Sequence, residues 1–273
     1  MKTKIFYTLA FIAAILFSCD DKIAVSLPTT AAVYVVDAFI DTRATTQVVH
    51  LTKSQPYFDE TLPPGVSGAT VTMTDGNETL LFTEDPTKAG DYLWTPSGGE
   101  LVKGVTYTLN ILVGGETLTA QSKLGRVPKI DSITFEKSDF PGESDKDFYR
   151  AQFWATDHEG KGDTYWIRTT KNDTLLNKPS EINVAYDAAF SKGSNFDGFT
   201  FIQPIRQGIN PDESDKDVAV SPYSVGDSVY VEIMSLTEAT FNFLNEVSVQ
   251  TNRPGGFGEL FARPLANGQY ICG

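Results

Sequence analysis

The sequence predicts an all-β protein made of two consecutive β-sandwich-like domains, with one short helix in the second. Two observations predict this fold class. Short runs rich in β-branched residues alternate between apolar and polar side chains, and Pro, Gly, Asp or Asn separate each run from the next. One segment, which begins at Ser235, carries apolar residues at helical spacing. The composition, 41% hydrophobic and 12% aromatic, is sufficient for a substantial core.

The first 18 residues are predicted to be a lipoprotein export signal. Lys2 and Lys4 form its positive start, residues 5–17 are almost wholly apolar, and Ser18 places a small residue directly before Cys19. The apolar run is too short to span a bilayer stably. We therefore expect the mature chain to start at Cys19, which a thioether-linked diacylglycerol would hold at a membrane surface. The alternative is an ordinary secretory signal in which Cys19 is incidental.

Residues 19–29 are predicted to form a tether, because their Ser, Pro and Thr content is typical of a linker. The first domain is predicted to span residues 30–124. Its strands are expected in a series of alternating runs at residues 33–40, 47–51, 69–73, 105–111 and 116–120. Gly114 and Gly115 are expected to form the two-residue turn between the last two of them.

The first domain also carries the pattern of a tyrosine corner. Leu101, Gly104 and Tyr107 resemble the turn that enters strand F of immunoglobulin-like and fibronectin type III sandwiches. In those folds the tyrosine hydroxyl bonds back to nearby backbone. We therefore expect an immunoglobulin-like or fibronectin III-like β-sandwich. The alternative is any hairpin with a buried tyrosine.

The domain boundary is predicted at residues 125–128, because Gly125 frees the backbone and Pro128 removes a backbone donor. This linker should be the first site of limited proteolysis. The C-terminal β-rich domain is then predicted to span residues 129–273. Its strands are expected in the runs 131–135, 148–155, 164–170, 199–202 and 228–233.

The predicted helix of the second domain begins at Ser235. Ser235 and Glu238 have the spacing of a capping box, and Phe241, Leu244 and Val247 then recur at helical intervals. The simplest interpretation of that apolar stripe is packing against a sheet.

The net charge limits the possible binding partners, and the number of cysteines limits the possible disulfides. A formal charge of −13 disfavours nucleic acid and anionic lipid, so nucleic-acid binding is excluded as a function. Lipidation would use Cys19 and leave Cys272 without a partner, so no intrachain disulfide is expected. No second segment has the length and apolarity of a membrane span, which leaves the lipid as the expected anchor.

Catalytic patterns are lacking, so we expect a protein that is not an enzyme and carries no cofactor. His50 and His158 are not paired by any metal-ligand spacing, and the sequence has neither HExxH nor paired CxxC motifs. Ser67 lies between Gly65 and Gly68, and this spacing does not fit a nucleophile elbow.

One loop carries a candidate calcium site. Asp157, Glu159 and Asp163 offer oxygen ligands over a short distance, but Gly160 stands at the fourth position, where an EF-hand loop would have its glycine at the sixth. The alternative interpretation is a polar hairpin turn.

The order of short motifs along the mature chain resembles the domain of unknown function 4249 family. The resembling segments extend through both predicted domains: residues 35–40, 66–71 with 75–76, 90–92, 104–107, 127–133, 157 with 160, 165–168, 196–198, 226–229 and the helix around Phe241.

This resemblance implies a two-domain lipoprotein of Bacteroidota-type bacteria, commonly encoded beside TonB-dependent outer-membrane receptors. The chain is therefore expected to be lipid-anchored in the outer membrane and to face the cell exterior. Asp20 and Asp21 also resemble a surface-export signal. The implied role is a non-enzymatic accessory that captures ligand for such a receptor or docks on it in nutrient uptake. The ligand is not implied. The alternative is a structural or adhesive module of the cell surface.

The resemblance implies no catalytic residue, because none is established for the family. It also implies a Gly-rich stretch and an aromatic strand beyond residues that correspond to Pro264 and Asn267. The sequence ends at Gly273. We therefore expect its C-terminal end to be remodelled or truncated.

Overall fold

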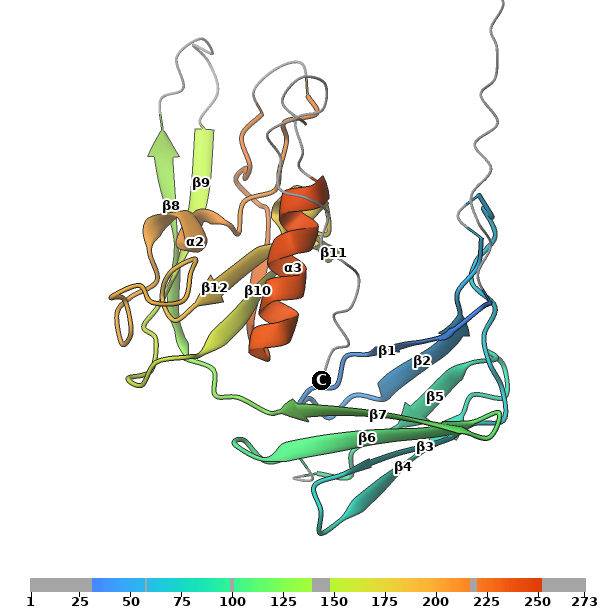
Figure 1. Cartoon of the computed structure of the whole chain (residues 1–273). Coiled ribbons are helices and arrows are strands. Elements are labelled where there is room, and N and C mark those ends of the chain that lie inside the picture. The colour runs from blue at the N-terminus through green and yellow to red at the C-terminus, as the bar shows by residue number, and fades with distance from the viewer. Residues whose placement is uncertain (1–30, 57, 99–100, 139–147, 217–219, 252–273) are drawn as a thin grey trace, which may run out of the picture.

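The computed structural model describes residues 31–56, 58–98, 101–138, 148–216 and 220–251. Within these residues the chain forms two lobes, and each lobe has its own apolar cluster (Figure 1). Most of the regular structure of the described residues is antiparallel strand, so the predicted all-β fold class is confirmed.

Seven strands form the first lobe, in the spatial order β1-β2-β5-β4-β3-β6-β7. Figure 1 shows β1, β2 and β5 lying over β3, β4, β6 and β7. The two layers are joined at β4, which pairs with β3 through residues 79–82 and with β5 through Thr83 and Glu84. The bounds are β1 Tyr34–Ala38, β2 Gln47–Lys53, β3 Thr70–Thr74, β4 Thr79–Glu84, β5 Asp91–Trp94, β6 Thr106–Val113 and β7 Glu116–Lys123.

Buried side chains from both layers fill the space between them. Leu51 in β2, Val71 in β3, Phe82 in β4 and Ile111 in β6 belong to one cluster and are almost inaccessible to solvent. Because side chains of a strand alternate between faces, each strand contributes its buried set to this space and exposes the other. The arrangement is the sandwich that the alternating runs predict.

Tyr107 occupies the predicted corner at the start of β6. Its side chain is buried, and its hydroxyl accepts a hydrogen bond of 2.7 Å from the backbone N–H of Val102. Gly104, in the turn between them, has a φ of 85°, which side chains rarely tolerate. The predicted bond from a corner tyrosine to nearby backbone is confirmed.

We expect Tyr107→Phe to lower the free energy of unfolding of the first lobe by about 1 kcal/mol, because the Val102 N–H loses a part-buried acceptor. Denaturant unfolding followed by fluorescence measures the change. Tyr34→Phe, in the exposed edge strand β1, is the matched control. An unchanged midpoint for Tyr107→Phe would show that the corner bond adds nothing to stability.

The second lobe contains two sheets. β8 and β9 form a hairpin sheet, and β10 is the centre of the other, with β13 on one side and β12 and β11 on the opposite side. The bounds are β8 Ile130–Ser138, β9 Phe148–Ala155, β10 Thr164–Lys171, β11 Thr174–Leu175, β12 Asn183–Tyr186, β13 Val229–Ser235, the 3₁₀ helix η1 Pro179–Glu181, α2 Gln203–Gln207 and α3 Glu238–Thr251.

One apolar cluster joins the two sheets of this lobe. Phe153 of β9, Tyr165 of β10 and Phe201 in the loop before α2 are fully buried in it. The ring centroid of Phe201 lies 5.5–5.6 Å from those of the other two. A smaller cluster holds α3 on the β10–β12 sheet through Phe241 and Leu244. The predicted packing of the helix stripe against a sheet is confirmed for these two residues.

Two local expectations are wrong. The helix does not start at Ser235, because Ser235 is the last residue of β13, and Thr237 caps α3 by accepting the N–H of Thr240 at 3.1 Å. Residues 199–202 form no strand: only Thr200 makes an isolated bridge, to Thr156, before α2 begins.

None of the helices in the described part of the chain combines the length and apolarity needed to cross a bilayer.

Candidate functional site

Three aspartates from separate segments meet on the second lobe. Asp157 follows β9, Asp187 follows β12, and Asp197 lies in the loop that leads to α2. Each brings one carboxylate oxygen within 4.8 Å of the others. The bridge between Thr156 and Thr200 and the fully buried Phe201 hold the first and third segments together.

These carboxylates accept hydrogen bonds from loop backbone. Asp157 accepts the N–H of Gly198, Asp197 accepts the N–H of Gly160 at 2.9 Å, and Asp187 accepts that of Gly162 at 2.8 Å. Such bonds to a charged acceptor are stronger than those between neutral groups. The cluster therefore fastens the 157–163 loop to the two neighbouring turns.

The predicted calcium set is grouped differently in the structure. Asp157 lies with Asp187 and Asp197 rather than with Glu159 and Asp163, and Asp163 forms an ion pair of 2.7 Å with Arg126. Carboxylate oxygens are the ligands that Ca²⁺ prefers, but a calcium ion takes about six to eight of them. Because the backbone N–H groups already use oxygens of all three aspartates, the geometry favours a structural role, and calcium binding stays a prediction.

Asp157 is the most unusual of the three electrostatically. Its residue is only 4% exposed, and burial raises the pKa of its carboxyl above the ordinary range. A 2.6 Å hydrogen bond from the hydroxyl of Tyr165 and the bond from Gly198 oppose this rise, while the charges of Asp163 and Asp187 add to it. The carboxylate therefore depends on its donors to remain ionised.

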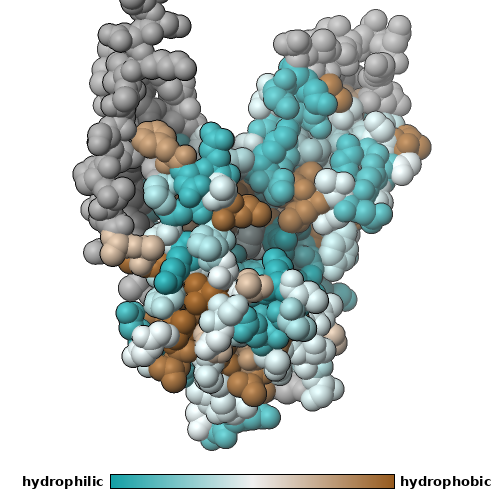
Figure 2. Space-filling model, turned by 90° about the vertical axis from the view of Figure 1, so that its right-hand side faces the viewer, coloured by the Kyte–Doolittle hydropathy of each residue, from teal (hydrophilic) through white to brown (hydrophobic). Residues whose placement is uncertain are grey.

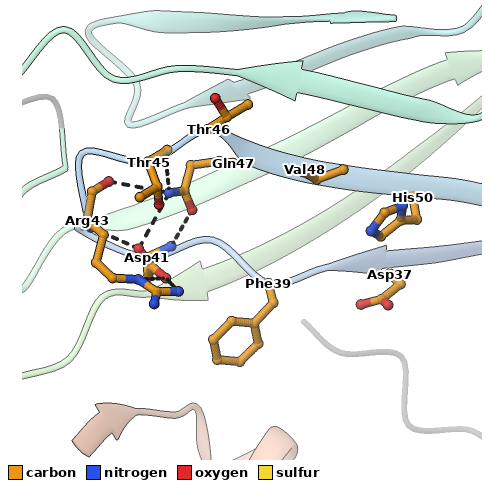
Figure 3. Close-up of a pocket in the computed structure, with 9 residues that line it drawn as sticks. All are labelled: Asp37, Phe39, Asp41, Arg43, Thr45, Thr46, Gln47, Val48 and His50. Carbon is orange, nitrogen blue, oxygen red and sulfur yellow. Dashed lines mark hydrogen bonds and ion pairs between the residues drawn. The ribbon is translucent and has the colours of Figure 1, made fainter. Parts of the chain in front are cut away.

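A second candidate is a hollow on the first lobe with a volume of about 190 Å³. Figure 3 shows Asp41, Arg43 and Gln47 at one end and Asp37 with His50 at the other. The remaining lining residues are Phe39, Thr45, Thr46 and Val48.

The charges at the first end of this hollow neutralise each other. Arg43 pairs with Asp41 at 2.5 Å, and the amide of Gln47 donates to the carbonyl oxygen of Thr45 at 2.8 Å. Burial works against ionisation of Asp41, but the bonds from Arg43 outweigh it, so the pKa of Asp41 lies below its ordinary value. This end of the hollow is polar and has little net charge.

His50 at the other end pairs with a carboxylate across the sheet. Its Nδ1 lies 2.6 Å from Asp91, which is its direct partner in the β2–β5 register. Asp91 also pairs with Lys88 at 2.7 Å. Burial opposes its ionisation, yet the bonds from Lys88 and His50 prevail and lower its pKa. Cross-strand pairing accounts for this arrangement without a catalytic role.

The hollow lies beside the junction of the two lobes. The ring of Phe39 meets that of Trp166 in β10 edge to face, with centroids 5.6 Å apart. Arg43 forms an ion pair of 3.1 Å with Glu232 in β13. Side chains from the two lobes therefore contact each other next to the hollow.

The segment predicted as a linker is also held against the second lobe. Arg126 donates to Asp163 at 2.8 Å and to the carbonyl oxygen of Gly160 at 2.7 Å. A Cβ on Gly125 would lie 2.8 Å from the Cβ of Ser235, so the backbone approaches β13 closely at this point. These contacts oppose the opening that early proteolysis requires.

Arg126→Ala is expected to speed cleavage between residues 124 and 130 by about fivefold, because it removes two hydrogen bonds worth about 1 kcal/mol together at this exposed site. Proteinase K is the suitable protease, since it does not need the arginine and cuts after apolar residues such as Leu124. Lys129→Ala, which alters a neighbouring exposed side chain, is the control. An equal cleavage rate for wild type and Arg126→Ala would mean that these hydrogen bonds do not protect the segment from proteolysis.

Exposed apolar side chains occur on both lobes. On the face shown in Figure 2, polar residues separate them into small groups. Single exposed apolar residues are normal for a soluble protein, so exposure alone does not identify a binding surface.

Comparison with protein families gives one decisive result. A family model described as Domain of unknown function (DUF4249) matches residues 20–264. The chain belongs to this family. The predicted family membership is thus confirmed, and the DUF4249 match includes both lobes and their junction. Comparison with curated proteins gives no match, and comparison with solved structures gives none.

The DUF4249 match begins one residue after Cys19. The predicted signal, the tether and Cys19 lie outside the described residues, as does the C-terminal segment with Pro264, Asn267 and Cys272. The predicted lipid site and the expected change at the C-terminal end stay predictions.

Proposed function

We propose that the mature protein is a surface lipoprotein of the outer membrane, which acts as a non-enzymatic accessory to a TonB-dependent nutrient-uptake receptor. Cys19 at the end of an apolar signal is the observation that carries this proposal, since this pattern supports lipid attachment to a membrane. The receptor as partner follows from the family resemblance. The accessory either captures ligand or docks on the receptor.

The length of the tether supports this role. Fourteen residues separate Cys19 from Tyr34, the first residue of β1, and a fully extended chain of that length reaches at most about 50 Å. The lobes can therefore stand clear of the lipid surface and still remain close to a neighbouring receptor. Confinement of this kind raises the effective concentration, so a weak contact is sufficient for partnership.

The paired charges also favour binding over catalysis. The carboxylates of Asp41 and Asp91 have lowered pKa values and fixed partners, which suits recognition by shape and hydrogen bonding. Asp157 is buried and engaged with Tyr165 and Gly198. A general acid or base needs a titratable group within reach of substrate, and these groups are committed to the fold.

Cys19→Ala is expected to abolish labelling by a fatty-acid analogue and to release the protein into the soluble fraction, because one thioether-linked lipid is the proposed anchor. Metabolic labelling and cell fractionation measure both effects. Ser18→Ala, which keeps a small residue before the cysteine, is the control and should be labelled normally. Membrane retention of Cys19→Ala would refute the anchor.

Digestion of intact cells by an added protease tests the surface location, and crosslinking followed by mass spectrometry tests the partner. The proposal requires cleavage in intact cells and a TonB-dependent receptor among the crosslinked proteins. Protection from protease, or crosslinks that contain no receptor, would favour the structural or adhesive role instead.

A further inference from the structure

Two phenylalanines are displayed at a turn of the second lobe. Phe196 is 43% exposed and Phe199 is 59% exposed, and their ring centroids lie 6.2 Å apart. Phe190, earlier in the same loop, is also exposed. Apolar rings of this size cover about 150–250 Å² each when buried, so together they offer a substantial contact area.

The turn that carries the two rings is rigidly held. The N–H of Phe199 donates to the carbonyl oxygen of Phe196, and its own carbonyl oxygen accepts the N–H of Asp157 at 2.9 Å. Gly198 has a φ of 74° and donates to the Asp157 carboxylate. Since the backbone is already fixed, binding through these rings loses little conformational entropy. The aspartate cluster thus holds the two exposed phenylalanine rings in position.

Acidic side chains border the turn. Glu159 lies against it, because a Cβ on Gly198 would come within 3.2 Å of the Glu159 Cγ. Asp197 is part of the turn itself and is partly exposed. Lys192, the nearest base along the loop, pairs with Glu238 of α3 at 2.8 Å. Arg126 also reaches the adjoining loop at Gly160, but it pairs there with Asp163. The border of the turn therefore keeps the negative charge of Glu159 and Asp197 and complements a surface that carries Lys or Arg.

The ring geometry selects the class of partner. The planes of Phe196 and Phe199 are inclined by 77°, so they offer no flat platform on which a sugar ring stacks. The acidic border disfavours insertion among anionic lipid headgroups. Protruding aromatic side chains with a charged border are typical of the anchor residues of protein interfaces.

We propose that the turn of residues 196–199 docks into an apolar socket bordered by basic residues on a protein partner. This inference rests on the proposed function, because the TonB-dependent receptor is the partner to which the turn is assigned. Phe199 and Phe196 enter the socket, and Glu159 faces the basic border.

Site-specific photocrosslinking tests this surface in the full-length lipidated protein in its native membrane. Benzoylphenylalanine replaces Phe199 in one variant and Leu81 in another. Leu81, in β4 of the first lobe, is also 59% exposed and is the matched control. The expected result is a receptor crosslink from position 199 and none from position 81.

The other outcomes separate the two proposals. A receptor crosslink from position 81 but not from position 199 overturns the docking turn and leaves the accessory function standing. A crosslink from position 199 to lipid, or to a protein other than the receptor, overturns the assigned partner. No receptor crosslink from either position overturns the docking turn, and the general crosslinking experiment above then decides by itself whether the accessory function stands.

Binding of the purified receptor then measures the contribution of each side chain. Phe199→Ser is expected to raise the Kd at least about tenfold, as is typical of an interface anchor. Glu159→Lys is expected to raise the Kd and to reduce its dependence on salt. Leu81→Ser should leave the Kd unchanged. Because the Phe199 side chain is exposed, an unaltered melting temperature is expected, and an unchanged Kd in a folded Phe199→Ser variant refutes the docking turn.

Discussion

Tyr165→Phe is expected to lower the free energy of unfolding of the second lobe by about 3 kcal/mol at neutral pH, the upper end for a hydrogen bond to a charged group. Tyr165 is fully buried, and its hydroxyl donates to Asp157 at 2.6 Å. Without that donor, the one hydrogen bond that the described residues still give this buried carboxylate is the longer one of 3.3 Å from the N–H of Gly198. An ionised group left without its principal partner carries most of the cost of its lost solvation.

The effect should depend on pH in a definite direction. Burial already raises the pKa of Asp157, and the Tyr165 bond is the main influence that lowers it. A carboxyl whose folded pKa exceeds its unfolded value contributes stability below the unfolded pKa, and that stability is lost as pH rises through the folded pKa. Removing the Tyr165 hydroxyl raises the folded pKa further. The loss of unfolding free energy caused by Tyr165→Phe should therefore be larger at about pH 7 than at about pH 3.

A double-mutant cycle with Asp157→Asn checks the cause. Asparagine does not ionise, so in its presence the pH dependence of the Tyr165→Phe effect should disappear. Tyr230→Phe is the control, because Tyr230 is 61% exposed and its effect should stay within about 0.5 kcal/mol. Urea unfolding of the four variants gives the coupling energy. A coupling below about 0.5 kcal/mol would show that the two side chains do not act together.

Alternation along the sequence was sufficient to predict most strands, because one buried face imposes a period of two. In β2, Val49 and Leu51 are buried while Val48 and His50 are partly exposed. Gly114 and Gly115 both have positive φ, which the predicted two-residue turn between β6 and β7 requires. These features depend on near neighbours in the chain.

Other features depend on tertiary contacts that no local pattern records. Phe201 looks like a strand residue by composition, but it is buried as part of a loop that continues into α2. Strands β4 and β5 lay outside the predicted runs, although Leu80 and Phe82 show the same alternation around the exposed Leu81. Asp and Glu residues next to these strands shorten the alternating pattern, so it was not recognised as a strand.

The aspartate cluster illustrates the same limit at the candidate site. Asp157 was recognised from its own loop, whereas Asp187 and Asp197 lie 30 and 40 residues further along the chain. In the structure the turn at residues 196–198 packs against the 157–163 loop, where Asp197 accepts the N–H of Gly160. Sequence spacing cannot reveal groups that only the fold of the second lobe brings together.

Trp166→Ala is expected to lower the free energy of unfolding of the second lobe by about 3 kcal/mol, the lower end for loss of a large aromatic side chain. Trp166 packs against the buried cluster of Val184, Tyr186 and Phe241, and so helps to hold α3 on its sheet. The Arg168 guanidinium also lies 5.1 Å from its ring centroid. The lower end applies because Trp166 is only partly buried.

The same ring contacts Phe39 of the first lobe, so its loss should also loosen the junction. Phe39→Ala separates the two effects, because it removes the junction contact and leaves the packing of α3 intact. We expect Phe39→Ala to lower the free energy of unfolding by about 1 kcal/mol, which is the typical contribution of an aromatic pair. Calorimetry should show a lower second-lobe transition for Trp166→Ala, while small-angle X-ray scattering should show a changed lobe arrangement for both variants. If Phe39→Ala matched the full stability loss of Trp166→Ala, the junction rather than the helix would be the main role of this tryptophan.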